Sequence, residues 1–164
     1  MQKAALLGLF VLGLTEAKTT AGGKCPEVEY MEDFDLSRYV GKWYTQESDA
    51  TNKWVPAGTD CVTKEFGVDE DGNGDLYFRG NYTIANKWVS AGYRGSGGKL
   101  YDCETGVCQA TMGWSTRRFP FKIFYTDYEN FDISYSCYDK WGDNAYESLS
   151  IVSREQTMSL ELYE

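Results

Sequence analysis

Histidine is absent from the 164 residues of this sequence. Its absence excludes Ser-His-Asp and Cys-His catalysis, as well as zinc or haem held by histidine. Cationic residues are also scarce, because 16 Lys and Arg stand against 25 Asp and Glu and leave a net charge of -9. Nucleic acids and anionic membrane surfaces both require a basic patch. Neither is therefore expected as a partner.

Long apolar runs are missing as well, with one short exception at the N-terminus. Lys3 precedes an apolar run over residues 4–14, which is too short to span a bilayer. Small residues at Ala17 and Ala21 offer cleavage sites. This arrangement is typical of a secretory signal peptide over residues 1–21. We expect one secreted, soluble domain over residues 22–164, without stable membrane insertion.

The remainder of the chain reads as short strands broken by Gly, Asp and Asn, with no long helical period before the C-terminus. The expected strands are 42–48, 59–67, 75–84, 88–96, 108–115, 121–128, 131–137 and 145–153. Eight antiparallel strands with short connections predict an all-β, up-and-down barrel. A barrel of this size can hold one small ligand.

An acidic segment, Asp69–Gly74, imitates the start of a calcium-binding loop. The bidentate acid that such a loop requires falls at Gly80, and strand patterns rather than helices flank the segment. We therefore interpret the segment as a β-turn and expect no metal site.

The stretch over residues 33–44 predicts a short helical turn that leads directly into the first strand. Gly41 allows a sharp backbone turn, and Trp43 places a large ring where it can plug one end of a barrel. This Gly-x-Trp-Tyr resembles the first signature of the lipocalins, which are small secreted barrels that carry apolar ligands. Taken alone, Trp43 is equally explained as a core tryptophan.

Two further segments follow in the order that this resemblance needs. Thr126-Asp127-Tyr128 precedes a hairpin turn and looks like the second signature. Residues 151–154 look like the third, whose arginine, here Arg154, packs over the signature tryptophan in a favourable cation–π contact. Within the family, residues 24–26 and 125–137 are most similar to the branch of apolipoprotein D, insecticyanin and crustacyanin.

The five cysteines of a secreted chain suggest disulfides. The resemblance implies a bond between Cys25 and Cys137, and Cys103 with Cys108 would clip one hairpin locally. In this branch the cysteine at the position of Cys61 pairs with one beyond a C-terminal helix. Here a helix would begin at residues 158–163 and stop with the chain, so we expect a truncated helix. A free thiol or an intermolecular bridge at Cys61 are the alternatives.

Strand alternation then assigns side chains to the interior. If Trp43 points inward, Thr45 and Glu47 share its face, with Glu47 either anchoring a polar ligand end or lying at the wet mouth. If Cys137 bonds to an arm outside the barrel, Ser134 and Ser136 point inward, and Ile133 and Tyr135, which would ordinarily be assigned to the core, point outward. By resemblance, Phe121, Ile123 and Tyr125 also line the interior.

Asn81 lies in an N-glycosylation sequon. If it carries sugar it faces outward, and Phe78 and Tyr82 then face inward; if it lines the pocket, the assignment is inverted. The repeat Asn-Lys-Trp-Val places Trp54 and Trp88 at one end of the barrel, either flanking a ligand entrance or packed on the surface. The candidate ligand-binding residues are therefore Thr45, Glu47, Trp54, Phe78, Tyr82, Trp88, Phe121, Ile123, Tyr125, Ser134 and Ser136.

The function that the resemblance implies is transport of a small hydrophobic molecule, namely a carotenoid, a bilin or a lipid, without a required cofactor. A protein-binding lipocalin, acting as an inhibitor or defence factor, is the alternative. An isomerase on the same barrel would need an activated inward nucleophile, so we expect no enzyme. Resemblance to crustacyanin also allows a homo- or hetero-oligomer.

Overall fold

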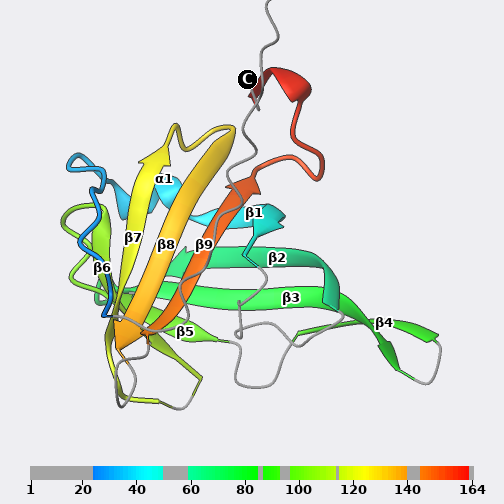
Figure 1. Cartoon of the computed structure of the whole chain (residues 1–164), viewed down its shortest axis with the longest axis horizontal. Coiled ribbons are helices and arrows are strands. Elements are labelled where there is room, and N and C mark those ends of the chain that lie inside the picture. Colours follow the sequence, from blue (N-terminus) through cyan, green and yellow to red (C-terminus); the bar gives the residue numbers. More distant parts are fainter. Residues whose placement is uncertain are drawn as a thin grey trace, which may run out of the picture.

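The computed structural model of the chain describes residues 24–49, 59–84, 87–92, 97–113, 115–139 and 145–162, without the side chains of 81–84, 87–92, 146 and 160. These residues form a β-barrel with almost no helix (Figure 1). The elements are α1 (Leu36–Tyr39), β1 (Gly41–Ser48), β2 (Thr59–Val68), β3 (Gly74–Ile84), β4 (Lys87–Gly92), β5 (Gly98–Tyr101), β6 (Val107–Met112), β7 (Phe119–Thr126), β8 (Phe131–Asp139), β9 (Ala145–Ser153) and the 3-10 turn η1 (Leu160–Leu162).

The sheet is antiparallel throughout and closes on itself. Its strand order is β2-β1-β9-β8-β7-β6-β5-β3-β4, and an additional pairing of β2 with β3 completes the ring. β4 and β5 pair with successive parts of β3, at 79–84 and 74–76, so together they occupy one position in the barrel. The predicted eight-stranded up-and-down barrel is therefore confirmed.

The strand expected over 88–96 is described as a strand only to residue 92, and β5 was missed. A run of glycines and a serine over residues 95–98 reads as a loop, yet Gly98 is the first residue of β5. A Cβ at Gly98 would lie 2.3 Å from the carbonyl oxygen of Thr111. Glycine therefore serves the close approach of β5 to β6, which sequence pattern alone does not show.

One end of the barrel is closed by aromatic side chains. The α1 turn begins at Asp35, whose carboxylate accepts a hydrogen bond from the Ser37 backbone N–H at 2.9 Å. The turn delivers Tyr39 into the barrel end, where its ring centroid lies 5.0 Å from that of Trp43 and 4.6 Å from that of Phe66. The predicted helical turn and the tryptophan plug are both present.

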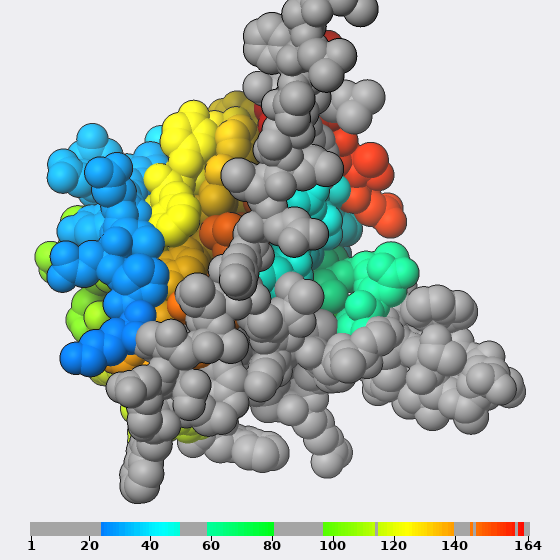
Figure 2. All heavy atoms as spheres, viewed as in Figure 1, coloured from blue at the N-terminus to red at the C-terminus, as the bar shows by residue number. Residues whose placement is uncertain are grey.

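An N-terminal arm runs outside the barrel and is attached at two points. Cys25 forms a disulfide with Cys137 on β8, as the resemblance implied. Further along, the Met31 backbone N–H donates to Ile123 O at 2.9 Å, and Met31 O accepts from Gly106 N at 2.7 Å. Figure 2 shows the arm, in blue, lying beside β7, in yellow. The arm thus covers the outside of the barrel wall.

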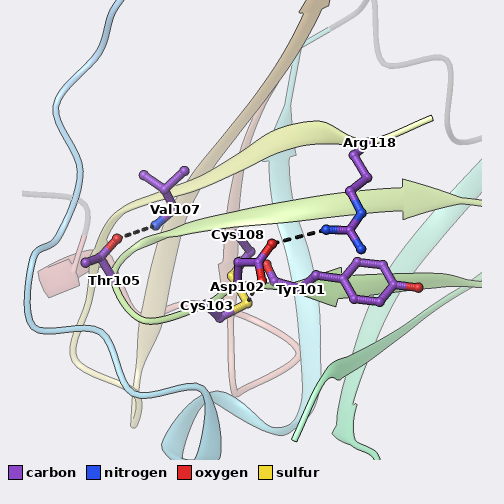
Figure 3. The surroundings of a disulfide bond; sticks show 7 residues. All are labelled: Tyr101, Asp102, Cys103, Thr105, Val107, Cys108 and Arg118. Carbon is purple, nitrogen blue, oxygen red and sulfur yellow. Dashed lines mark hydrogen bonds and ion pairs between the residues drawn. A yellow bond between two sulfur atoms is a disulfide. The ribbon is translucent and has the colours of Figure 1, made fainter. Parts of the chain in front are cut away.

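The second disulfide, between Cys103 and Cys108, spans the turn that joins β5 to β6. Beside it, the Arg118 guanidinium lies 3.1 Å from an Asp102 carboxylate oxygen and 4.2 Å from the centroid of the Tyr101 ring (Figure 3). The local hairpin clip expected for this cysteine pair is confirmed.

Among the described cysteines, Cys61 alone is outside a disulfide, and it is exposed. It has a φ of 53° and lies where the register of β2 against β3 shifts, between Asp60 and Thr63. The segment expected to begin a C-terminal helix contains the single 3-10 turn η1. Cys61 makes no disulfide with the described cysteines, and the truncated-partner, free-thiol and intermolecular-bridge expectations for it stay predictions.

Candidate ligand-binding site

The interior of the barrel holds a small cavity above the aromatic plug. Its volume is about 30 Å³. The cavity is lined by Lys64, Leu76, Phe78, Ala110, Met112, Phe119, Phe121, Ser134, Ser136, Ser148 and Ser150. This lining combines apolar walls with a small number of hydroxyl groups and one amine.

Four serines form the polar side of the cavity. Ser134 and Ser136 on β8 point inward, while Cys137 of the same strand bonds to the external arm. In the ladder they pair with Ser150 and Ser148 of β9, which line the same cavity. The predicted inward orientation of both β8 serines is confirmed. The β9 pair was missed, although Ser148-Leu149-Ser150-Ile151 repeats the same alternation of small polar and apolar residues.

The apolar wall comes from neighbouring strands. Phe78 on β3 and Phe121 on β7 are buried and line the cavity, as expected. Ile123 is fully buried in the hydrophobic core but is not part of the lining. Leu76 also lines the cavity, together with Ala110, Met112 and Phe119, none of which was among the candidate ligand-binding residues. The binding roles of Phe78 and Phe121 stay predictions, since the structure establishes only their position.

Tyr125 does not line the interior, contrary to the sequence prediction. It is 51% exposed and its ring packs against that of Phe131 on the outer surface. The register of β7 against β8 shifts between Ile123 and Tyr125, so Phe124 is an extra residue in the strand. This β-bulge reverses the alternation, and Tyr125 takes the outward position opposite Ile133.

Glu47 is displaced by the same kind of irregularity in β1. The register against β9 shifts between Thr45 and Glu47, which makes Gln46 the extra residue. Glu47 then pairs with outward-facing Ile151 and is exposed, so its predicted place on the face of Trp43 is wrong. Thr45 stays on the inner face opposite Val152, and its buried hydroxyl has no hydrogen-bond partner in the described part of the chain.

Several candidates cannot be placed. Trp54 lies outside the described residues, as does the predicted signal peptide. Tyr82 and Asn81 lie in β3 and Trp88 in β4, but their side chains are outside the description too. Their assigned roles, including glycosylation of Asn81, stay predictions.

Arg154 seals the closed end of the barrel from outside. Its guanidinium carbon lies 3.7 Å from the centroid of the Trp43 ring, which has no exposed surface. The same side chain donates hydrogen bonds to the backbone carbonyls of four residues that lie around it, namely Tyr128, Lys42, Arg38 and Tyr39. The predicted pairing of Arg154 with Trp43 is confirmed.

Thr126, Asp127 and Tyr128 build the turn between β7 and β8. The Thr126 hydroxyl donates to Phe131 O at 2.8 Å and accepts from the Tyr128 N–H at 3.0 Å. Asp127 accepts from the Asn130 N–H at 2.7 Å. Tyr128, with a φ of 68°, presents the carbonyl that receives Arg154. This turn therefore helps to position the arginine.

Gly41 lies directly beneath that guanidinium, and replacing it with alanine is expected to destabilise the protein. Its φ is +104°, and a Cβ would lie 3.1 Å from Arg154 Nη1. We expect Gly41→Ala to lower the free energy of unfolding by about 1–3 kcal/mol, measured by urea denaturation. Gly67→Ala is the control, because its Cβ would meet Asp75 Cβ at an ordinary 3.7 Å. Equal effects at both positions would contradict the role assigned to Gly41.

A buried lysine and a buried aspartate lie near the closed end. Lys64 on β2 is 5% exposed and donates a hydrogen bond to Ser150 Oγ. Asp132 on β8 is fully buried, and neither carboxylate oxygen makes a hydrogen bond of ordinary geometry with the described residues. Burial raises the pKa of Asp132 to about 7, against the opposing attraction of Lys64. Burial likewise lowers the pKa of Lys64 to about 8.

Because the pKa of Asp132 is raised in the folded protein, its effect on stability changes with pH in a predictable direction. The folded protein holds the Asp132 proton more tightly than the unfolded chain, in which the pKa is about 3.9. Asp132 therefore reduces stability as pH rises from about 4 to about 7. We expect the difference in Tm, Asp132→Asn minus wild type, to increase steadily over that range in calorimetric scans.

Asp127→Asn is the control, because the pKa of Asp127 is shifted in the opposite direction from that of Asp132. Although partial burial acts against it, hydrogen bonds from Asn130 and the backbone hold the pKa of Asp127 below its usual value. Its contribution to stability is lost as pH falls below about 4. A Tm difference for Asp132→Asn that is flat between pH 4 and 7 would contradict the buried, proton-retaining carboxyl described above.

None of the helices in the described part of the chain has the length and apolar character that a membrane crossing requires. The same residues contain no cluster of three or more His, Cys, Asp or Glu side chains that could hold a metal ion.

The chain is similar in sequence to several characterised proteins. Apolipoprotein D of Rattus norvegicus is 31% identical over 144 residues, which cover 82% of this chain and 67% of that protein. Retinol-binding protein 4 of Gallus gallus is 30% identical over 142 residues, covering 80% and 67%. Bilin-binding protein of Pieris brassicae is 26% identical over 159 residues, covering 95% and 80%. The chain thus spans about two thirds of the length of the first two, and 66% of bovine apolipoprotein D.

Solved structures give the same fold. Insecticyanin from Manduca sexta superposes with a TM-score of 0.61 at 21% sequence identity, and the match covers 87% of this chain and 76% of insecticyanin. At this identity the likeness concerns the barrel alone. No model of a known protein family matches the chain.

Proposed function

Because the chain belongs to the lipocalin family, we propose that it is a secreted carrier of a small hydrophobic molecule held inside the barrel. The observation that carries this proposal is the cavity, where aromatic and aliphatic walls face a few hydroxyl groups above a closed aromatic floor. Apolar walls with few polar groups suit a ligand that is mostly apolar and polar at its tip. Burial of the apolar part supplies roughly 25 cal/mol per Å² before ordering costs.

The class of ligand follows from the relatives and from the lining. One relative is named for retinol and another for bilin. A carotenoid, a bilin or a lipid would each fit an interior of this chemistry. The protein needs no cofactor for such a role. We do not propose an enzymatic reaction, because the named activities among these relatives are binding activities.

Titration with a fluorescent apolar probe, followed by emission of the probe, tests the proposal. Ser136→Trp fills the cavity from β8, and Lys122→Trp is a matched control on the outer side of β7, where Lys122 Nζ donates to Val28 O of the arm. We expect wild type and the control to bind the probe with similar affinity. Ser136→Trp should bind at least about 10-fold more weakly, since its indole occupies the site. Equal binding by all three proteins would place the probe outside the barrel and refute the proposal.

A second candidate function is the binding of another protein through the loops. The observation that favours it is the small size of the described cavity, about 30 Å³. If no apolar probe binds the wild-type barrel, this second function becomes the better account.

Secretion is part of the proposal. The charged and apolar N-terminal pattern over residues 1–21 supports a signal peptide. Entry into the secretory pathway would also expose Asn81 to glycosylation and is consistent with the two disulfides of the fold.

A further inference from the structure

Lys64 is the single cationic side chain among the residues that line the described cavity. It sits on β2 with Trp43 and Phe78 as its ladder neighbours, so it reaches the space directly above the aromatic floor. An ammonium group has three N–H donors. In the described part of the chain one of them is used, in the hydrogen bond to Ser150 Oγ. Donors of a nearly buried cation are therefore left facing the cavity.

The other polar groups of the lining are hydroxyls. Ser134, Ser136, Ser148 and Ser150 can all donate hydrogen bonds, and the lining contains no carboxylate. Asp132 is fully buried and lies outside the lining. A ligand end in this space therefore meets hydrogen-bond donors around a positive charge. The chemistry complementary to this arrangement is a group that only accepts hydrogen bonds and carries a negative charge.

We propose that the barrel selects amphiphiles that end in a carboxylate, with the carboxylate against the Lys64 ammonium and the apolar chain directed toward the open end. This inference rests on the proposed carrier function and specifies its ligand. The cavity beside Lys64 is small, about 30 Å³, so the head group lies next to the ammonium. Phe78 and Phe121 border the same space and supply apolar surface for the first part of the chain.

Charge balance at the floor makes binding sensitive to pH. The ionisable groups that act on this pair are Lys64 itself on β2, Asp132 on β8, Tyr39 of α1 and Arg154 after β9. An added carboxylate next to Lys64 disfavours the charged form of Asp132, so binding near neutral pH is accompanied by proton uptake. Above about pH 8 Lys64 itself loses its proton. Both effects weaken carboxylate binding as pH rises.

A purely structural role for the two residues makes a different prediction. If Lys64 and Asp132 only neutralise one another, a charge on the ligand does not change its affinity for the cavity. A carboxylic acid and its methyl ester would then bind equally well at every pH.

The experiment compares cis-parinaric acid with its methyl ester, which share one fluorescent chain and differ in head-group charge. At pH 6.5 we expect the acid to bind the wild-type protein at least about 10-fold more tightly than the ester. This preference should shrink toward unity by pH 9.5. Lys64→Met should remove the preference at pH 6.5 while ester binding is retained. Lys42→Met, on the exposed face of β1, should leave the preference unchanged.

The possible results distinguish a failure of the carboxylate inference from a failure of the proposed carrier function. If acid and ester bind wild type with equal affinity, the carboxylate inference is overturned and the carrier function stands. If neither binds, both are overturned. Should Lys64→Met fail to fold, the pH titration of the wild-type preference decides alone. Asp132→Asn adds a second readout: because Asp132 raises the pKa of Lys64, its removal should make the preference for the acid decline at lower pH than in wild type.

Discussion

Removal of the disulfide between Cys25 and Cys137, by changing both to alanine, is expected to lower the free energy of unfolding by about 4–5 kcal/mol. The bond joins residues 112 apart in sequence, so its loss releases a very long loop in the unfolded chain. Chain-entropy arguments give about 4.7 kcal/mol for a loop of about 100 residues. A loss of this size is a large fraction of the 5–15 kcal/mol that stabilises a typical domain.

The Cys103–Cys108 pair provides the matched control, because the same chemistry closes a loop of sequence separation 5. The same relation gives a contribution of only about 2 kcal/mol for so short a loop. In guanidinium denaturation, the variant without the Cys25–Cys137 bond should therefore be clearly less stable than the variant without the Cys103–Cys108 bond. If the short-loop variant loses as much stability as the long-loop variant, the entropic explanation fails.

Replacement of Trp43 by alanine is expected to cost about 3–5 kcal/mol. The indole is fully buried, and its Nε1 donates to Tyr39 O at 2.9 Å. It also receives the Arg154 guanidinium on its face. Truncation leaves a cavity, a Tyr39 carbonyl that keeps only the longer hydrogen bond from Arg154 at 3.4 Å, and a partly buried guanidinium without its ring. Tyr125→Ala is the control, since this exposed ring should cost less than about 1 kcal/mol.

A double-mutant cycle separates the ring–guanidinium contact from the cavity. We expect Trp43→Ala and Arg154→Met to be non-additive by about 0.5–2 kcal/mol, as a partly desolvated cation–π pair requires. Chemical denaturation of the two single variants and the double variant supplies the coupling. Additivity within error would show that the stacking seen between the two residues contributes nothing measurable.

The inward orientation of Ser134 and Ser136 on β8 could be predicted, because the disulfide of Cys137 fixes which face of the strand points outward, whereas the hydrophobic pattern alone suggests the opposite face. Ile133 and Tyr135 look like core residues, but Cys137 must reach the arm outside, and strand alternation then turns Ser134 and Ser136 inward. In β1 and β7 no such constraint exists, and strand alternation gave the wrong orientation for two side chains. Glu47 and Tyr125 each follow a β-bulge, and a single inserted residue reverses every later side chain in the strand.

The role of Lys64 could not be predicted from the sequence, for a different reason. Its spacing from Phe66 places it on the inner face of β2, which was a usable signal, but a charged residue at a core position is ordinarily assigned to a loop or an outer face. Its significance depends on Ser150 and Asp132, which come from strands far away in sequence. Only the register of the closed barrel brings these groups together.

Mass spectrometry of an organic extract decides whether the barrel holds an apolar small molecule. The protein should be purified from its natural source without detergent, and its absorption spectrum recorded before extraction. We expect a co-purifying molecule with an extended apolar part, at about one per chain, which is coloured if it is a carotenoid or bilin. A colourless protein that yields no such molecule, and that binds no apolar probe on titration, would contradict this expectation.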